Sequence, residues 1–226
     1  MRRAAVLLFL IAPSASGQDV PLAADGLPVG VETVEVQILR AVYGIESPLF
    51  AVPMEVINET SYPIFLASAP AAWAISGLAG ADLDPALRLT LSQALSLGTT
   101  FALKRTVNRA RPYVALGDMA TRDRRYLRED VRDPYSFPSG HTSSAWVTAT
   151  SLSLSYPEWY VIVPSAAWAT GMGLTRMWHG VHYPTDVLAG AAIGIGSAVL
   201  GHVVLPDVFE EGEQGPAVPF RIRVAL

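Results

Sequence analysis

Three short segments, at residues 104–112, 138–144 and 175–186, hold most of the side chains that are suited to chemistry. They contain lysine and arginine cations, serine and threonine hydroxyl groups, three of the four histidines and one aspartate. Cations and hydroxyl groups bind phosphate oxygens, and histidines can attack or protonate a phosphate ester. Together the three segments predict phosphoryl-transfer chemistry.

The first segment places a group of cations at the end of a predicted helix. Lys104, Arg105, Arg109 and Arg111 all lie between residues 104 and 112. Their charges can bind an anion, but the helix dipole also favours cations at a helix C-terminus. Taken alone, this segment is better explained by a structural role.

The second segment, Pro138-Ser139-Gly140-His141, opens another predicted helix. A Ser-Gly pair at a helix N-terminus offers backbone N–H groups and a hydroxyl to an anion, and the glycine allows close approach. The alternative is an ordinary helix cap, for which serine is a preferred residue. His141 is harder to explain as a cap, because the positive end of the helix disfavours imidazolium unless an anion is present.

In the third segment, Asp186 follows His182 by four residues, and Pro184 suits the first position of a helix. Asp186 can therefore reach back to one ring nitrogen of His182 and leave the other nitrogen's lone pair free for attack. The alternative is that Asp186 only complements the helix N-terminus and that His182 is a surface residue. His179 is seven residues from Asp186 and is expected to be a wall residue of the pocket, whereas His202 is expected to pack inside the last helix.

The order and separation of these residues resemble the three-part signature of the type 2 phosphatidic acid phosphatase (PAP2) and vanadium haloperoxidase superfamily. The resemblance covers about residues 62–205, and Thr175 stands where the family usually has serine. The matching positions are Lys104, Arg111, Pro112, Pro138, Ser139, Gly140, His141, Arg176, His182 and Asp186.

The resemblance implies a role for each matching side chain. His182, oriented by Asp186, would attack phosphorus to form a phosphohistidine, and His141 would protonate the leaving oxygen and then activate water. Neither a metal nor a cofactor is implied, and vanadate is expected to inhibit. The residues that would bind the phosphate oxygens are Lys104, Arg111, Ser139, Gly140 and Arg176.

Helices must position these segments. The apolar residues of 31–45 recur every three or four positions, which predicts an N-terminal amphipathic helix. The fold class expected is all-α, a PAP2/haloperoxidase-like bundle of about five core helices plus this amphipathic helix. The insertion at 117–135 carries five arginines and five acidic residues and is expected to be a solvated loop. The five core helices are predicted at 63–81, 86–103, 141–156, 159–175 and 185–205.

Composition bounds the remaining choices. The 226-residue chain is 51% hydrophobic and only 16% charged, so much of its helical surface must meet protein or lipid. It has no cysteine, which excludes a disulfide framework and a cysteine nucleophile, and its formal charge of −4 argues against nucleic-acid binding. Five helices of these lengths could span a membrane, but the arginine-rich insertion would then lie outside, against the positive-inside tendency.

The N-terminus has a basic start, an apolar run and small residues, which predicts a secretory signal peptide with cleavage before Gln18. The protein is therefore expected to be exported to the cell envelope, in the periplasm or at the outer face of the membrane. The segment from Phe220 to Leu226 alternates apolar and polar residues and is a candidate strand. The expected organisation is a signal peptide at 1–17, a covering segment at 18–61, a phosphatase domain at 62–205 and an acidic tail at 206–226.

The function predicted is a metal-independent phosphatase that hydrolyses phosphate monoesters or diphosphates, with a phosphorylated lipid as the favoured substrate and a membrane as the favoured partner. A soluble exported acid phosphatase of broad specificity, acting on small phosphate esters, is the nearest alternative. A vanadate-dependent haloperoxidase is the alternative from a different class, although such enzymes are usually much longer chains.

Overall fold

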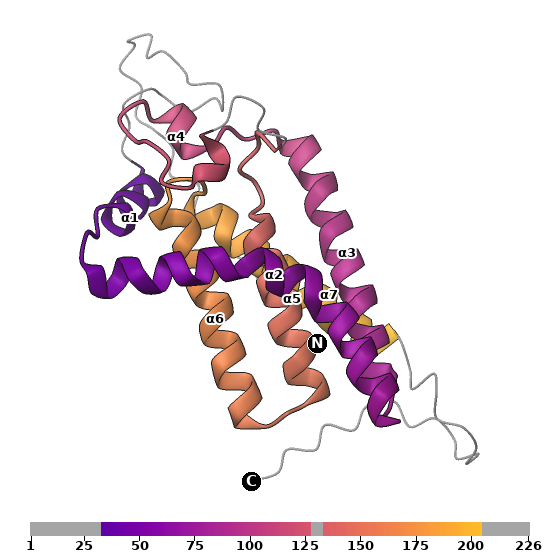
Figure 1. Ribbon diagram of the computed structural model, residues 1–226. Coiled ribbons are helices and arrows are strands. Elements are labelled where there is room, and N and C mark those ends of the chain that lie inside the picture. The colour runs from indigo at the N-terminus through magenta and orange to yellow at the C-terminus, as the bar shows by residue number, and fades with distance from the viewer. Residues whose placement is uncertain (1–32, 128–132, 205–226) are drawn as a thin grey trace, which may run out of the picture. The chain divides into compact units, whose positions relative to one another are not determined.

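The computed structural model describes residues 33–127 and 133–204, which belong to the unit Glu32–Leu226. Within these residues the chain forms helices and no strand (Figure 1). The predicted signal peptide, C-terminal strand and acidic tail lie outside the described residues. The elements are α1 (Val34–Tyr43), α2 (Pro48–Ala79), α3 (Asp84–Val107), α4 (Pro112–Ala115), a 3-10 turn (Arg124–Tyr126), α5 (Gly140–Ser155), α6 (Trp159–Trp178) and α7 (Pro184–Val204).

The expected all-α bundle is confirmed, and the five predicted core helices correspond to α2, α3, α5, α6 and α7. The largest difference is α2, which starts at Pro48 rather than Pro63 and continues through Pro53, Pro63 and Pro70. Each internal proline removes one helical hydrogen bond, so prolines normally indicate a boundary. The limit expected between residues 61 and 62 falls inside this continuous helix.

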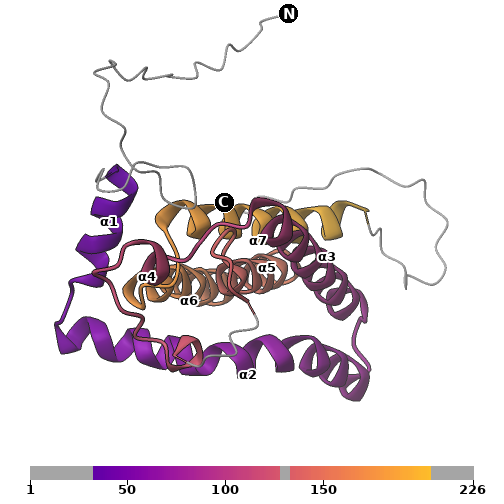
Figure 2. The same ribbon diagram turned by 90° about the horizontal axis from the view of Figure 1, so that it is seen from above.

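Helix α5 is central, because it contacts α2, α3, α6 and α7. Seen from above, α5 and α6 lie between α2 and α7 (Figure 2). Glycines let α7 approach α5 closely: a Cβ added to Gly190 would lie 2.5 Å from the Ser139 carbonyl oxygen, and one added to Gly194 would lie 2.5 Å from that of Ser143. The small-residue face predicted on α7 is therefore the face that packs on α5.

The bundle buries many polar residues beside its apolar core clusters and exposes apolar side chains on much of its outside. Large apolar side chains on α2, such as Leu49, Leu66 and Leu78, are exposed. Of the described helices, α2 and α7 are long and apolar enough to cross a membrane. Helix α3 buries mainly polar or charged residues, because only Ala86 and Leu89 among its buried residues are apolar; the others are Asp84, Ser92, Ser96, Thr100 and Lys104.

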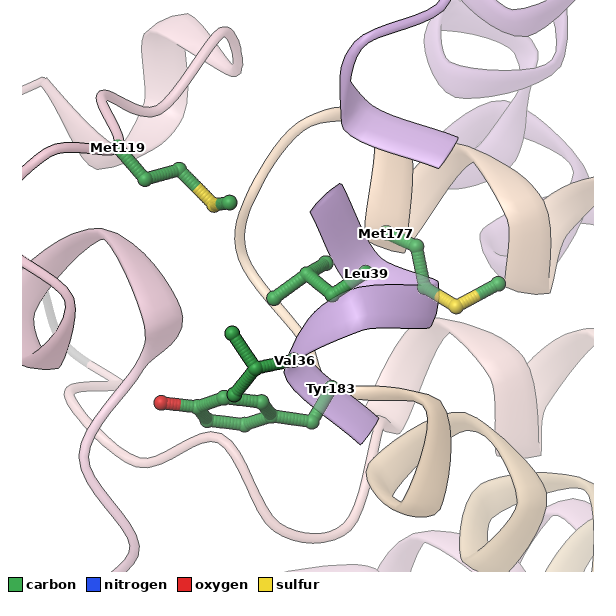
Figure 3. Close-up of a cluster of buried hydrophobic side chains, with 5 residues drawn as sticks. All are labelled: Val36, Leu39, Met119, Met177 and Tyr183. Atoms are coloured by element: carbon green, nitrogen blue, oxygen red, sulfur yellow. The ribbon is translucent and has the colours of Figure 1, made fainter. Parts of the chain in front are cut away.

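Helix α1 packs at the end of the bundle that carries the third chemical segment (Figure 3). Val36 and Leu39 are buried in a cluster with Met119, Met177 and Tyr183. Tyr183 lies directly after His182, so the N-terminal amphipathic helix packs immediately behind the predicted nucleophile.

Candidate active site

The three segments meet at one end of the bundle. The first spans the C-terminus of α3, the second opens α5, and the third runs from the last turn of α6 into the first turn of α7 (Figure 1). Backbone hydrogen bonds join them: the Ser136 N–H donates to the Arg109 carbonyl at 2.8 Å, and the Ser139 N–H donates to the Asp186 carbonyl at 2.9 Å. The fold thus gathers residues that are far apart in the sequence.

A cavity of about 1170 Å³ opens at this meeting point. Lys104, Gly140, His141 and His182 line it, so each of the three segments contributes to its wall. The remaining predicted residues lie beneath this surface or beside it.

His182 is almost fully buried, with 1% of its surface exposed. Its Nε2 lies 3.1 Å from Nη1 of Arg111, and because a guanidinium can only donate, Nε2 must accept. The ring proton is therefore on Nδ1, which lies 3.6 Å from Oδ2 of Asp186. Burial and the charges of Arg111 and Lys104 lower the pKa of His182 well below its usual value, so the ring is neutral.

Asp186 is completely buried. Its Oδ2 accepts the backbone N–H of Tyr183 at 2.8 Å, and its Oδ1 accepts Nη1 of Arg109 at 2.9 Å. The carboxylate is thus held through both oxygens on the side of His182 that faces away from Arg111.

Lys104 and Arg111 converge on one anionic oxygen. Oδ2 of Asp133 lies 3.0 Å from Nζ of Lys104 and 3.2 Å from Nη2 of Arg111. The Asp133 side chain is 45% exposed, whereas that of Arg111 is completely buried. A carboxylate oxygen therefore lies where both cations can bind an oxyanion.

Arg176 is completely buried and does not line the cavity. Its Nη1 lies 3.3 Å from Oδ2 of Asp123, and its Nη2 donates to Oδ1 of Asn58. Asp123 comes from the 117–135 insertion but is 2% exposed, so the expectation of a wholly solvated loop is wrong there. A loop with balanced charges gives no sequence signal of which carboxylate will reach a buried arginine.

The Ser139 hydroxyl acts as a helix cap. Its Oγ accepts the backbone N–H of Thr142 at 3.4 Å and lies 2.9 Å from the Thr142 hydroxyl. Ser139 is completely buried, while the neighbouring Gly140 lines the cavity. The Ser139 hydroxyl is therefore a helix cap in the structure, as the alternative interpretation expected. Gly140 is the member of the pair that reaches the cavity surface.

His141 stands on the cavity wall between aromatic rings. Its ring centroid is 5.2 Å from that of Tyr62 and 5.9 Å from that of Phe65. Its Nε2 lies 3.4 Å from Nη1 of Arg125, another residue of the insertion. Burial, followed by the charge of Arg176, lowers the pKa of His141 well below its usual value.

The other two histidines lie away from the cavity surface. His179 is completely buried, its Nδ1 is 2.7 Å from the Thr175 carbonyl oxygen, and it is not among the cavity-lining residues. Its expected place on the pocket wall is therefore wrong. His202 packs in α7 as expected, with Nε2 3.2 Å from the Ser155 hydroxyl.

Sequence reasoning missed the apolar wall of the cavity. Tyr62 and Phe65 of α2 and Leu97 and Phe101 of α3 line it. Such residues are common in any helix, so no local signal separates a ligand-contacting one from a packing one. The cavity therefore combines a cationic end with an apolar side.

The donor set suits an oxyanion better than a metal. In the described ranges, 33–127 and 133–204, no three His, Asp or Glu side chains are grouped to hold a metal ion. The groups that converge on the cavity end are instead cations and histidines, which bind and transform phosphate oxygens.

Solved structures share this fold. The crystal structure of LpxE from Aquifex aeolicus aligns with a TM-score of 0.56 at 24% identity, over 75% of this chain and 94% of that one. The transmembrane PAP2-type phosphatidylglycerolphosphate phosphatase from Bacillus subtilis aligns with a TM-score of 0.55 at 25% identity, over 75% of this chain and 86% of that one.

Curated relatives match over shorter segments. A lipid A 1-phosphatase of Porphyromonas gingivalis is 35% identical over 88 residues, which are 38% of this chain and 20% of the relative. An undecaprenyl-diphosphatase of Sulfolobus acidocaldarius is 38% identical over 69 residues, which are 30% of this chain and 33% of the relative. The model of the PAP2 superfamily matches residues 85–210, which include all three chemical segments and more than half of the sequence. The chain therefore belongs to the PAP2 superfamily.

Proposed function

We propose that this protein is a phosphatase that hydrolyses phosphate monoesters or diphosphates of lipids. The observation that carries the proposal is a single cavity in which His182, His141 and Lys104 adjoin an apolar wall. A lipid phosphate has the same two parts, a charged head and a long apolar chain. Relatives named for action on lipid A and undecaprenyl diphosphate support this substrate class.

The cations bind the substrate phosphate. Lys104 and Arg111 take two of its non-bridging oxygens where they now hold Oδ2 of Asp133, so that carboxylate moves away on binding. Gly140 allows the phosphate to approach the first turn of α5. Arg176 adds positive charge from beneath the cavity. These charges offset the negative charge that shifts onto the oxygens during transfer.

Transfer proceeds in two steps. Nε2 of His182 attacks phosphorus as the ester P–O bond breaks, and His141 gives its proton to the leaving oxygen. Water then attacks the phosphohistidine, His141 takes a proton from it, and the P–N bond breaks to release phosphate. The first step needs the His182 tautomer that has its lone pair on Nε2, and the contact between Arg111 and Nε2 favours this tautomer.

The protein acts, in this proposal, at a lipid surface of the cell envelope, without a metal cofactor. The exposed apolar side chains of α2 and the span-length helices α2 and α7 support this location. The predicted signal peptide supports export. Vanadate, which takes up the five-coordinate geometry of phosphorus in transfer, should compete with the substrate.

The test is phosphate release from lipid phosphates and from a small soluble ester, in detergent micelles, with the wild type and His182→Ala. We expect the wild type to prefer the lipids and His182→Ala to lose at least about a thousandfold in kcat, as removal of a nucleophile does. His202→Ala, a histidine away from the cavity, serves as the matched control and should keep its turnover.

Two results would overturn the proposal. Ordinary turnover by His182→Ala would show that His182 is not the nucleophile. A preference for the soluble ester would favour the broad-specificity acid phosphatase. An acid-labile phosphoenzyme in the wild type, trapped by rapid denaturation and missing in His182→Ala, would support the phosphohistidine.

A further inference from the structure

Arg109 lies directly behind the catalytic carboxylate. Its Nη1 donates to Oδ1 of Asp186 at 2.9 Å and to the Thr185 hydroxyl at 2.8 Å. Its guanidinium carbon lies 3.8 Å from the centroid of the Tyr183 ring. Arg109 thus binds three of the residues that follow His182, and its side chain is only 15% exposed.

Glu35 of α1 holds Arg109 from the other side. One carboxylate oxygen accepts Nη2 of Arg109, and the other accepts the Thr185 hydroxyl. Glu35 is itself largely buried, with a side chain 19% exposed. The side chains of Glu35, Arg109 and Asp186 therefore form a row of alternating charges in space, and this row ends beside the proposed nucleophile, His182.

The position of Glu35 is fixed by its neighbours on α1. Val36 and Leu39 pack against Tyr183 and Met177, as Figure 3 shows. Because Tyr183 also lies under the Arg109 guanidinium, the same ring is shared by the apolar contact and the charged one. Helix α1 cannot shift without moving the Glu35 carboxylate.

The geometry explains why the Asp186 carboxylate needs a second support. Its Oδ2 accepts the Tyr183 N–H and stands 3.6 Å from Nδ1 of His182. The Ser136 side chain adds a neutral hydrogen bond to this carboxylate, and Arg109 is the cation that contacts it. Arg109, bound to Oδ1, fixes the plane of the carboxylate and so the direction from which it faces the imidazole.

We propose that Arg109, held in place by Glu35, is a positioning residue that orients Asp186 behind His182, so that helix α1 is part of the catalytic apparatus. Helix α1 precedes residue 85, where the superfamily match begins. This inference rests on the proposed phosphatase function and extends it to a pair of residues outside the three motifs' matching positions.

The competing explanation is that the ion pair only fastens α1 to the bundle. The two explanations differ in what the folded variants lose: a positioning pair lowers kcat, whereas a fastening pair lowers only thermal stability. The charges of the pair also act on His182, which is faced by Lys104, Arg111 and Arg176 as well. Loss of the Arg109 charge leaves the Asp186 carboxylate less compensated and raises the pKa of His182. Loss of the Glu35 charge leaves Arg109 less compensated and lowers it. Coulomb interaction gives these opposite shifts whenever the pair lies near His182, so the shifts test that electrostatic link, and the loss of kcat at unchanged KM separates positioning from fastening.

The experiment measures kcat, KM and the pH dependence of kcat for Arg109→Gln, Arg109→Lys and Glu35→Gln on the lipid phosphate that the wild type hydrolyses best. Arg40→Gln is the matched control, because it removes the exposed ion pair between α1 and Asp118, 2.7 Å long, and leaves the Arg109 contacts intact. Thermal unfolding of each variant verifies that it is folded.

We expect Arg109→Gln to lose about 10- to 100-fold in kcat, with KM within about twofold, as for loss of a support that acts on the transition state. Arg109→Lys should recover part of the loss, and Glu35→Gln should lose about threefold or more. The acid limb of the kcat profile should move to higher pH in Arg109→Gln and to lower pH in Glu35→Gln.

The inference is overturned if Arg40→Gln loses as much activity as Glu35→Gln, or if the acid limbs of the two charge variants stay at the wild-type pH. These outcomes differ from failure of the phosphatase assignment, which would be seen as a wild type without turnover or an active His182→Ala. If Arg109→Gln does not fold, the kcat and the acid limb of the kcat profile are compared between the wild type, Glu35→Gln and Arg109→Lys instead.

Discussion

At the scale of single residues, Asp133 is the side chain that most directly competes with a substrate. Its carboxylate oxygen binds both Lys104 and Arg111, which are the cations assigned to phosphate. Removing its charge should leave that site empty of a rival anion. Asp133→Asn should therefore bind inorganic phosphate and vanadate about 2- to 5-fold more tightly, within the energy of a half-exposed ion pair.

The measurement is the inhibition constant of each anion in the wild type and in Asp133→Asn. Asp118→Asn, an exposed carboxylate of the same insertion, is the control and should leave both constants unchanged. Weaker inhibition of Asp133→Asn would show that the carboxylate assists anion binding instead of competing with it.

In the proposed mechanism, the two cavity histidines set the pH dependence of turnover. Burial and neighbouring cations hold both pKa values well below the usual value in the free protein, so His182 is ready to attack while His141 lacks the proton that it must donate. A bound phosphate anion raises the pKa of His141. The alkaline limb, on which His141 loses its proton, should lie at higher pH in the profile of kcat than in that of kcat/KM.

Steady-state rates between about pH 4 and pH 9 test this, since the kcat/KM profile reports the free protein and the kcat profile reports the substrate complex. Coincident alkaline limbs would mean that the substrate does not change the His141 pKa. His141→Asn should lose the alkaline limb altogether in whatever activity it retains.

The motif residues could be located from the sequence because their order and spacing are local properties. Their partners could not. Asp123, Asp133 and Asn58 reach the site only through the path of a loop and the length of α2, and Asn58-Glu59-Thr60 looks in the sequence like a surface glycosylation site. The sequence around a carboxylate or amide side chain does not identify the distant arginine that it will bind.

At the scale of helices, the close packing of α7 on α5 positions the second and third segments. A Cβ at Gly194 would lie 2.5 Å from one backbone atom of α5 and 2.8 Å from another, so Gly194→Ala must push the helices apart. We expect a loss of about 1–3 kcal/mol in the free energy of unfolding, as for an overpacked interior, and reduced kcat because Ser139 and Asp186 are joined across this interface.

Gly196→Ala is the control on the same helix, because its added Cβ meets nothing within 4 Å. It should be neutral or slightly stabilising, since alanine favours helix over glycine by up to about 1 kcal/mol. Thermal unfolding of both variants in one detergent makes the comparison. Equal stability of the two would contradict the close contact.

Helix periodicity and length predicted the five core helices well, since long apolar segments have few other ways to fold. The start of α2 was missed because its three internal prolines resemble a helix boundary in the sequence. A helix can continue through a proline when neighbouring groups satisfy the backbone carbonyl that loses its hydrogen bond, and the sequence does not show those neighbours. The buried polar face of α3 was also missed, because residues such as Ser92 and Ser96 differ little in sequence from surface serines.

At the scale of the whole molecule, an exterior with many exposed apolar side chains around an interior with many buried polar ones predicts residence in a membrane. We expect the protein to sediment with membranes, to resist extraction by alkaline carbonate and to enter the detergent phase on phase separation. The exposed apolar residues of α2, including Leu66 at 74% exposure, provide the physical reason, because large exposed apolar patches mark contact with lipid or protein.

A soluble periplasmic protein of similar size, measured in the same fractions, is the control. Release of the phosphatase into the aqueous phase by osmotic shock would contradict membrane residence and favour the soluble alternative. The low charge content had already pointed to lipid or protein contacts, but composition alone cannot say which faces of the helices would make them.

The cationic end of the cavity has one further consequence, for chemical labelling. Lys104 is the only lysine in the sequence, and it lies on the cavity wall. Apart from the α-amino group, an amine-selective reagent therefore has a single target in the whole protein, and that target is in the proposed phosphate site. Reductive methylation or acylation of Lys104 would place one probe at the active site, where its attachment could be followed by mass and blocked by bound phosphate, and so would count active molecules in a preparation.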